Sequence, residues 1–333
     1  MATIYDVSVK AGVSLATVSR VVNNNPKVSE KTRQKVLDAM KSLDYRPNSI
    51  AQSLASNRSN SVGILVSELS GQFYGEMLCG IENELRRAGK HVIIAAGHSN
   101  RETEADGIEF LISRSCDALI LHVEAVSDDY LIELSKGPVP IIVINRHVAE
   151  IESACISLDN ELGGYQACSA LLGKGHREIA YIAGPLWKAD AQARLRGHRR
   201  ALAEAGLEFS AELMAEGDYT ETGGGEAMRQ LLATHVPFSA LVCANDEMAS
   251  GAMSVAREAL LELPEQLSIV GFDNVVFARH LYPKLTTINY PIREMGRMAG
   301  RLTLERVYQI KPEKVRHLFK PELVSRDSVA QHH

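Results

Sequence analysis

The chain has 333 residues, of which 45% are hydrophobic and 23% are charged. This composition is typical of a soluble globular protein, and the length favours two or three domains. The sequence has no apolar run long enough to span a membrane, and its first residues lack the apolar core of a signal peptide, so we expect a cytoplasmic protein. Five widely spaced cysteines without a CxxC pair predict free thiols and give no support to a disulfide framework or a zinc site.

The net charge of −5 conceals two regions of opposite sign. Residues 1–60 hold nine Lys and Arg against four Asp and Glu, which gives +5. The remaining residues hold 27 basic against 37 acidic side chains, which gives −10. A small basic segment on an acidic body suggests an anionic partner for that segment. Chance clustering on a solvated surface fits the charge alone equally well.

Three short helices are predicted in residues 1–47. A capping box begins at Thr3, and Gly12 can end the first helix. Ser14 can cap the second helix and Ser29 the third. Two short helices joined by a glycine turn and braced by a third predict a helix-turn-helix unit.

The second helix of such a unit lies in the major groove of DNA, with its first residues at the base edges. Leu15 and Ala16 occupy this tip, where they can contact thymine methyl groups, and Arg20 can donate two hydrogen bonds to a guanine. An ordinary polar helix surface is the alternative for these positions. Small polar side chains suited to phosphate oxygens surround the tip: they are Ser14, Thr17, Ser19, Asn23, Ser29 and Thr32.

The segment GVSLATVSRVVN, residues 12–23, resembles the signature of the lactose/galactose repressor family. The match runs without gaps from TIYDVS to YRPN, and the apolar residue before Ala16 is similar to the galactose-repressor branch. The resemblance implies a sequence-specific transcriptional regulator, in the first place a repressor. It makes Leu15, Ala16 and Arg20 the base readers and adds Tyr5 to the residues that contact the DNA backbone.

Residues 48–60 form the predicted linker. Asn48 can cap a helix of about two turns, which is too short to be stable alone, and the sequence alone favours an ordinary interdomain linker. The resemblance instead implies a hinge helix, in which Leu54 wedges into a base step of the minor groove. Ala51 and Ala55 would let two such helices approach each other across a dimer axis.

From residue 61 onward, short apolar runs alternate with amphipathic stretches. SVGILVSEL (61–69), KHVIIAAG (90–97) and five similar runs indicate buried parallel strands, and stretches such as 75–88 and 160–172 indicate helices. This alternation predicts an α/β fold with doubly wound parallel sheets, divided between two sheets. Ligands of such folds bind beyond the carboxyl ends of the strands, which here predicts a cleft between two lobes.

Carboxylates, amides, aromatic rings and one guanidinium follow these strands, and this set suits the hydroxyls and the C–H face of a sugar. Taken singly, each of them fits a helix cap or an ion pair better than a ligand contact. The resemblance extends over the whole body, whose effector-binding core is similar to periplasmic sugar-binding proteins. It implies that Arg194, Asn245 and Asp273 hold the effector, with Asp190 as the acid of the galactose branch and Phe73 as a ring-stacking wall.

The roles of Trp187 and Tyr290 stay open. For Tyr290 the reason is that some relatives have an aromatic residue near the last crossover between the lobes, where this chain reads Tyr290-Pro291-Ile292. The chain ends without a leucine heptad, so a homodimer is expected rather than a four-chain bundle, and a two-fold dimer predicts a near-palindromic operator. The family's layout implies one effector-binding and dimerisation domain, 61–333, whose lobes comprise 61–159 with 291–320 and 160–290 with 321–330.

The sequence contains no GxGxxG, P-loop, GxSxG or HExxH motif, and we expect neither a cofactor nor a metal. The alternative is a sugar-binding receptor or a sugar-acting enzyme on the same scaffold, but neither needs a basic helix-turn-helix segment. The sequence therefore predicts a regulator, not an enzyme, in which a sugar in the cleft shifts the lobes and the hinge helices through its differential affinity for two states. Which sugar binds, and whether it releases or recruits DNA, stays open.

Overall fold

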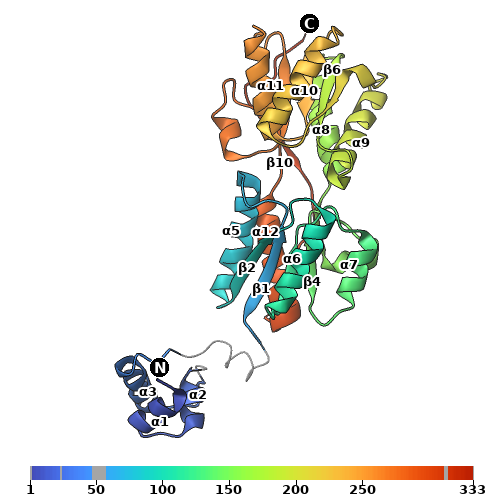
Figure 1. The fold of residues 1–333 in the computed structure, drawn as a ribbon. Helices are drawn as coiled ribbons and strands as arrows, with labels where there is room; N and C mark the ends of the chain where they lie inside the picture. Colours follow the sequence, from blue (N-terminus) through green and yellow to red (C-terminus); the bar gives the residue numbers. More distant parts are fainter. Residues whose placement is uncertain (1, 23–24, 47–57, 311–313, 333) are drawn as a thin grey trace. The chain divides into compact units, whose positions relative to one another are not determined.

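The computed structural model describes residues 2–22, 25–46, 58–310 and 314–332. The chain divides into two compact units, residues 1–60 and 61–333, which are described separately (Figure 1). The five cysteines are free thiols, and all but Cys79 are buried. Across the described part of the chain, no helix is long and apolar enough to span a membrane.

The first unit is a three-helix bundle of α1 (Ile4–Ala11), α2 (Leu15–Val22) and α3 (Glu30–Ser42). Thr3 and Asp6 form a reciprocal capping box before α1, and Gly12 ends this helix in the left-handed conformation, with a φ of 62°. The hydroxyl of Ser14 accepts the backbone N–H of Thr17 at the start of α2. The helices enclose a small apolar core of Val7, Val18, Val21, Val36 and Ala39.

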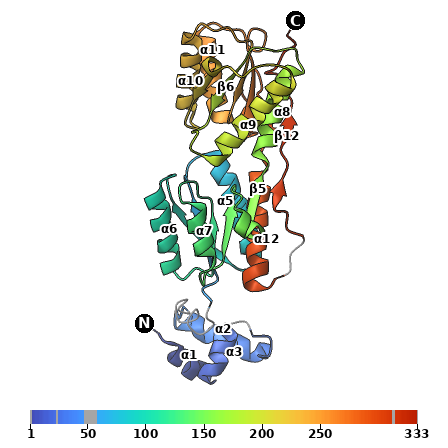
Figure 2. The same ribbon diagram turned by 90° about the vertical axis from the view of Figure 1, so that its right-hand side faces the viewer.

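The second unit contains two six-stranded sheets (Figures 1 and 2). The first sheet has the order β11-β5-β4-β3-β1-β2. Together with the helices and the 3-10 turn that cover it, it forms lobe 1: β1 (Ser61–Val66), α5 (Gln72–Arg87), β2 (His91–Ala96), α6 (Arg101–Ser113), β3 (Ala118–Leu121), α7 (Asp128–Ser135), β4 (Ile141–Ile144), η1 (Ala149–Ala154), β5 (Cys155–Leu158), α12 (Ile292–Tyr308) and β11 (Leu318–Phe319).

The second sheet has the order β12-β10-β9-β8-β6-β7. Its strands and the elements around them form lobe 2: α8 (Asn160–Leu172), β6 (Ile179–Ala183), α9 (Ala189–Glu204), η2 (Ala211–Leu213), β7 (Met214–Glu216), α10 (Glu221–Ala233), β8 (Ala240–Cys243), α11 (Asp246–Glu258), β9 (Ser268–Asp273), η3 (Val276–Arg279), β10 (Thr286–Asn289) and β12 (Glu322–Val324).

The predicted fold class, a helical N-terminal unit followed by a two-lobed α/β body with parallel sheets, is confirmed. The exception to the parallel arrangement is β12, which pairs antiparallel with β10. The chain leaves β10 for lobe 1 and returns from lobe 1 through β11 after a connection of two residues, so β12 begins at the edge of the sheet where β10 ends.

The prediction of a buried strand is wrong for β2. Its residues are exposed or half-buried, and the side chain of Ile94 is 41% exposed. The reason is its place at the end of the sheet, where only β1 pairs with it. A continuous apolar run does not distinguish such an edge strand from a central one, in contrast to β1, in which every residue after Ser61 is buried.

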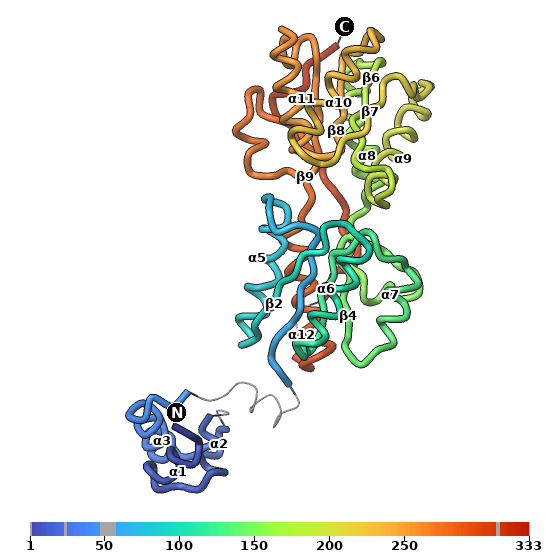
Figure 3. Tube along the Cα trace, viewed as in Figure 1, coloured from blue at the N-terminus to red at the C-terminus, as the bar shows by residue number. Residues whose placement is uncertain are grey.

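Three segments join the two lobes: β5 to α8, β10 to α12, and β11 to β12 (Figure 3). Within each lobe, a pair of helices makes backbone contact at a glycine. A methyl group on Gly197 of α9 would lie 1.9 Å from the carbonyl oxygen of Glu161 in α8. A methyl group on Gly80 of α5 would lie 2.1 Å from the carbonyl oxygen of Arg293 in α12. Both pairs therefore require glycine for their close approach.

Candidate functional site

The tip of α2 presents the predicted base readers on its outer face. Leu15 is 45% exposed, and Ala16 and Arg20 are exposed as well. Val18 and Val21 of the same helix are buried against α1 and α3, so the two faces of the helix are clearly separated. This helix therefore leaves its outer face available to a partner.

The residues predicted to contact the DNA backbone lie around this tip. Tyr5 is 63% exposed on α1. The Ser14 and Thr17 hydroxyls lie 2.9 Å apart, as do those of Ser29 and Thr32, so each helix start carries a pair of hydroxyl groups. Ser19 is half-buried on α2. Outside the described residues lie five predicted contacts: Asn23, Asn48, Ala51, Leu54 and Ala55.

In the second unit, a cavity of about 570 Å³ brings together the five predicted effector residues, and we call it the Arg194 cavity. Residues of both lobes line it, which places it in the cleft between them. Their role as ligands stays a prediction, but one cavity joins residues that are distant in the sequence. The five are Phe73, Asp190, Arg194, Asn245 and Asp273.

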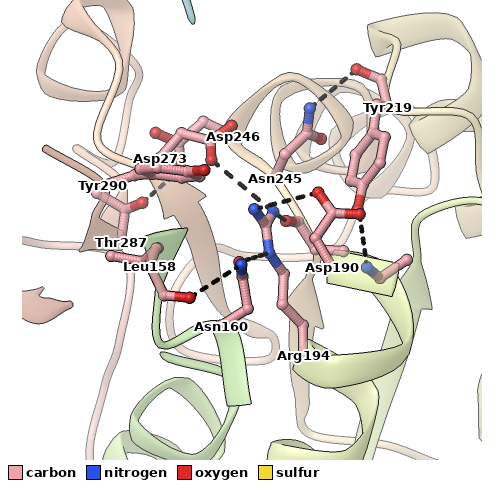
Figure 4. Close-up of polar contacts among 12 residues, drawn as sticks. Leu158, Asn160, Asp190, Arg194, Tyr219, Asn245, Asp246, Asp273, Thr287 and Tyr290 are labelled. Atoms are coloured by element: carbon pink, nitrogen blue, oxygen red, sulfur yellow. Dashed lines mark hydrogen bonds and ion pairs between the residues drawn. The ribbon is translucent and has the colours of Figure 1, made fainter. Parts of the chain in front are cut away.

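Arg194 lines this cavity, and its side chain is only 4% exposed. Figure 4 shows its contacts with Asn160, Asp190 and Asp273. Its Nε donates to the Oδ1 atom of Asn160 at 2.9 Å, and its Nη1 donates to the carbonyl oxygen of Ala244. The guanidinium lies 3.8 Å from the centroid of the Phe272 ring. These contacts fix the orientation of the cation, as a planar guanidinium permits.

Two carboxylates lie near this guanidinium without a direct hydrogen bond to it. Asp190 and Asp273 each have an oxygen 3.8 Å from an Arg194 nitrogen. The Oδ1 atom of Asp273 has no hydrogen-bond partner among the described residues. Burial raises the pKa of Asp273 well above its usual value, and the charge of Arg194 opposes this only in part. Asp273 lines the cavity, so this oxygen is a candidate partner for a ligand hydroxyl.

The backbone of Asp273 has a φ of 105°, a conformation that residues other than glycine rarely adopt. Such strained residues gather at binding sites, where the surrounding structure holds them in place. Together with the place of Asp273 in the cavity lining, this conformation supports a functional role for the residue.

Asn245 makes the contacts of a helix cap, which was the alternative interpretation of its sequence position. Its Oδ1 accepts the N–H of Met248 at the start of α11, and its Nδ2 donates to the carbonyl oxygen of Tyr219, each at 2.9 Å. The neighbouring Asp246 is fully buried and accepts hydrogen bonds from Thr287 and Val275. Asn245 therefore both caps the helix and fixes Tyr219 at the cavity wall.

The aromatic rings of Phe73 and Tyr74 form part of the lobe 1 wall of the cavity. The ring of Phe73 lies edge-on to Tyr290 at 5.0 Å and to His122 at 6.1 Å between centroids. The Tyr290 hydroxyl donates to Asn145 of lobe 1. Tyr290 follows β10 of lobe 2, so it connects the two lobes. Trp187 also lines the cavity and is 53% exposed.

Sequence reasoning missed an ion pair that joins the two lobes. The Nζ atom of Lys188, just before α9, lies 2.6 Å from Glu124, just after β3, and also donates to Ser99. Burial alone would raise the pKa of Glu124, but His122, Lys188 and the hydrogen bonds from Lys188 and Ser99 outweigh it, and the pKa is lowered. Both residues follow apolar strands, and this is the same pattern that indicated the other site residues. The sequence therefore contained a signal for each residue of the pair.

His122 is a second residue that the sequence did not indicate. It is buried, and its Nδ1 lies 3.1 Å from the Ser67 hydroxyl. Burial lowers its pKa, which keeps the imidazole neutral at physiological pH. Among the described residues, no cluster of three or more His, Cys, Asp or Glu side chains is arranged to hold a metal ion.

Two family models match the chain. Residues 3–48 match the bacterial regulatory proteins of the lacI family, and residues 168–329 match the periplasmic binding protein-like domain. The first match falls on the helix-turn-helix unit, and the second on most of lobe 2 together with α12 and β11 of lobe 1. The two models therefore match two parts of one chain, the helix-turn-helix unit and the body that contains the cleft.

The transcriptional regulator GalR of Escherichia coli is 39% identical over 330 residues, which cover 99% of this chain and 96% of that protein. The regulator AscG of the same organism is 33% identical and covers 91% of both chains. Among solved structures, the Lac repressor dimer bound to operator and the anti-inducer ONPF has a TM-score of 0.88 at 30% identity, with 99% of both chains covered. The complex of the transcriptional regulator CelR with cellobiose has a TM-score of 0.72 at 33% identity and covers 98% of this chain and all of the other.

These similarities extend over both units. The chain belongs to the LacI family of bacterial regulatory proteins and is a DNA-binding transcriptional regulator.

Proposed function

We propose that this regulator is a repressor that binds a near-palindromic operator as a homodimer and that a small sugar in the interlobe cleft controls its affinity for the operator. The observation that carries the proposal is the Arg194 cavity. It holds a fixed guanidinium and two carboxyl groups from lobe 2 and an aromatic wall from lobe 1. This set suits hydroxyl groups and the apolar face of a sugar ring.

On the DNA side, the proposal assigns base contacts to Leu15, Ala16 and Arg20 of α2. Arginine on guanine forms two hydrogen bonds, and apolar side chains contact thymine methyl groups. The proposal also assigns the minor-groove wedge to Leu54, on the resemblance alone. Leu54→Ala should weaken specific binding more than non-specific binding in a gel-shift titration, and an equal loss on both DNAs would count against the wedge.

Coupling between the two sites follows from the arrangement of the lobes. A sugar that contacts both lobes stabilises one relative orientation, and it shifts the DNA-binding equilibrium only by its differential affinity for the two states. Couplings of about 1–3 kcal/mol change affinity roughly 5–150-fold. Bound operator must change sugar affinity by the same factor, because the linkage is reciprocal.

The first experiment is a thermal-shift screen of neutral sugars on the full chain, since a ligand that binds the folded state raises its stability. Operator affinity is then measured with and without each sugar that binds. Asp273→Ala should abolish the sugar response while operator binding stays intact. A normal response of this variant would remove Asp273 from the site, and light scattering tests the dimer.

We also propose that the protein binds its sugar without converting it, as its relatives named above are regulators. A sugar-acting enzyme or a receptor on the same scaffold is not favoured, because neither explains the helix-turn-helix unit. Incubation of the protein with each bound sugar, followed by chromatography of the sugar, tests this point. A protein-dependent new product would contradict it.

A further inference from the structure

The cleft holds a second cavity that adjoins the Arg194 cavity. It has a volume of about 950 Å³, and we call it the distal cavity. Six residues line both cavities, so the cavities adjoin along a shared boundary, which we call the partition. These are His122, Glu124, Asn145, Trp187, Lys188 and Asp190.

The partition is polar and firmly held. The side chains of Lys188 and Glu124 are only 11% and 12% exposed. The carboxylate of the fully buried Glu104 accepts the backbone N–H groups of residues 124, 125 and 126 at 2.8–2.9 Å, which fixes the loop that carries Glu124. An ion pair on a fixed loop offers hydrogen-bonding groups at a defined place.

His122 adds a hydrogen-bonding group to this partition. Its Nε2 atom has no partner among the described residues, although the residue is buried. His122 lines both cavities, so its ring lies next to the space that a ligand would occupy. A buried polar atom without a partner is costly, and a ligand oxygen or hydroxyl can supply the missing hydrogen bond.

The lining of the distal cavity suits an uncharged ring with hydroxyl groups. Trp187 offers a flat, half-exposed ring, and Ser157 and Asp159 offer polar groups. The one arginine of this lining, Arg146, lies 2.6 Å from Asp128 and donates to the carbonyl oxygen of Val126. Its charge is therefore already neutralised, which disfavours an anionic group such as a phosphate.

We propose that the effector is a disaccharide, with one ring in the Arg194 cavity and the second in the distal cavity against Trp187. Lys188, Glu124 and His122 then face the linkage between the rings. Cavities of 300–1,000 Å³ hold ligands of drug size, which exceed a single sugar ring. This inference rests on the proposed function and narrows its ligand class.

Trp187 is the only tryptophan of the chain, so intrinsic fluorescence of the full chain reports on this partition. The probes are galactose and glucose, together with lactose, cellobiose, melibiose and maltose, which combine these rings through β or α linkages. We expect one disaccharide to bind at least about tenfold more tightly than either of its component sugars, which corresponds to about 1.4 kcal/mol. If galactose or glucose binds as tightly as the best disaccharide, the inference is wrong while the proposed function stands. If none of the six sugars binds or changes operator affinity, both are wrong.

A matched pair of variants separates the two cavities. Ala193 on α9 lines the distal cavity and not the Arg194 cavity, so Ala193→Phe should fill the distal cavity. This variant should weaken disaccharide binding at least about tenfold and leave monosaccharide binding within about twofold. Ala203→Phe, at an exposed position of the same helix that lines neither cavity, should change neither affinity.

Ala189→Phe provides a second route, because Ala189 is exposed, lines only the distal cavity and is less able to disturb folding. Thermal unfolding identifies a variant that fails to fold, and the other variant then decides. Disaccharide binding that is unchanged in the folded variants, or lost in parallel with monosaccharide binding, would overturn the assignment of the second ring.

Discussion

In the helix-turn-helix unit, the residues proposed to contact DNA bases lie on the surface, whereas in the cleft the proposed sugar ligands are largely buried and contact one another. Arg20 is exposed on α2, but Arg194 is bound to Asn160 and Ala244 beneath the cavity. The difference implies that the two sites respond differently to substitution. Changes on α2 should affect recognition without affecting folding, whereas changes in the cleft should affect both.

The largest effect is expected for Arg194→Ala. The substitution leaves Asp273 and Asp190 without their cation and Asn160 without its donor, all in a buried site. Removal of one partner of a buried ion pair costs about 3–5 kcal/mol. Urea unfolding followed by Trp187 fluorescence measures the loss, and Arg196→Ala, on the exposed side of the same helix, is the control. Unchanged stability would show that the cleft tolerates substitution as well as the α2 surface does, and the contrast between the two sites would be lost.

A second test uses the buried Asp246. Burial raises its pKa to about 7 in the folded protein, so the folded state binds a proton more tightly than the unfolded state. Its contribution to stability is therefore complete below pH 4 and is lost as the pH rises toward 7. The full contribution is on the order of a few kcal/mol.

Comparison with Asp246→Asn isolates this contribution from other titrating groups. The free energy of unfolding of the native protein minus that of the variant should decrease between pH 4 and pH 7. A constant difference over this range would mean that Asp246 stays ionised in the folded protein, and an increasing difference would reverse the assigned direction.

Arg20→Ala is expected to have a smaller effect, and on recognition alone. A bidentate arginine contact to guanine contributes about 1–3 kcal/mol of discrimination. Gel-shift titrations on operator variants should show relaxed specificity, while the unfolding transition stays unchanged because the side chain is exposed. A destabilised variant would remove the contrast between the two sites, and unchanged discrimination would count against Arg20 as a base reader.

The smallest effect is expected at the start of α1. Thr3→Ala removes the hydroxyl that accepts the N–H of Asp6, and loss of such a cap costs about 1 kcal/mol. The change should lower the stability of the helix-turn-helix unit as measured by amide exchange in that unit. Thr3→Ser keeps the cap and should behave like the native protein, and equal exchange rates in all three proteins would show that the capping box contributes nothing.

Local signals accounted for most of what the sequence predicted correctly. Thr3, Gly12 and Ser29 act on neighbouring residues, and the structure confirms their caps. The helix predicted over 160–172 coincides with α8. The exposed β2 and the two-residue β11 were not predictable, because an apolar run does not reveal which strand forms an edge, and very short strands have no pattern.

The cleft shows the same limit. A carboxylate or amide after a strand could be predicted as a helix cap or as a ligand, and Asn245 does in fact cap α11. The pairing of Lys188 with Glu124 depends on how two lobes meet, which no local pattern encodes. The resemblance to a family located the Arg194 cavity, but the partition behind it required the three-dimensional structure.

The glycine contacts of the helix pairs have a mechanical consequence. At Gly80 and Gly197 the main chains of two helices touch, so no side chain between them can change rotamer to absorb a displacement. Each lobe should then rotate as a rigid body, and the changes in backbone angles should be confined to the three connecting segments. Since β1 begins at Ser61, directly after the linker, a rotation of lobe 1 reaches that linker undiminished.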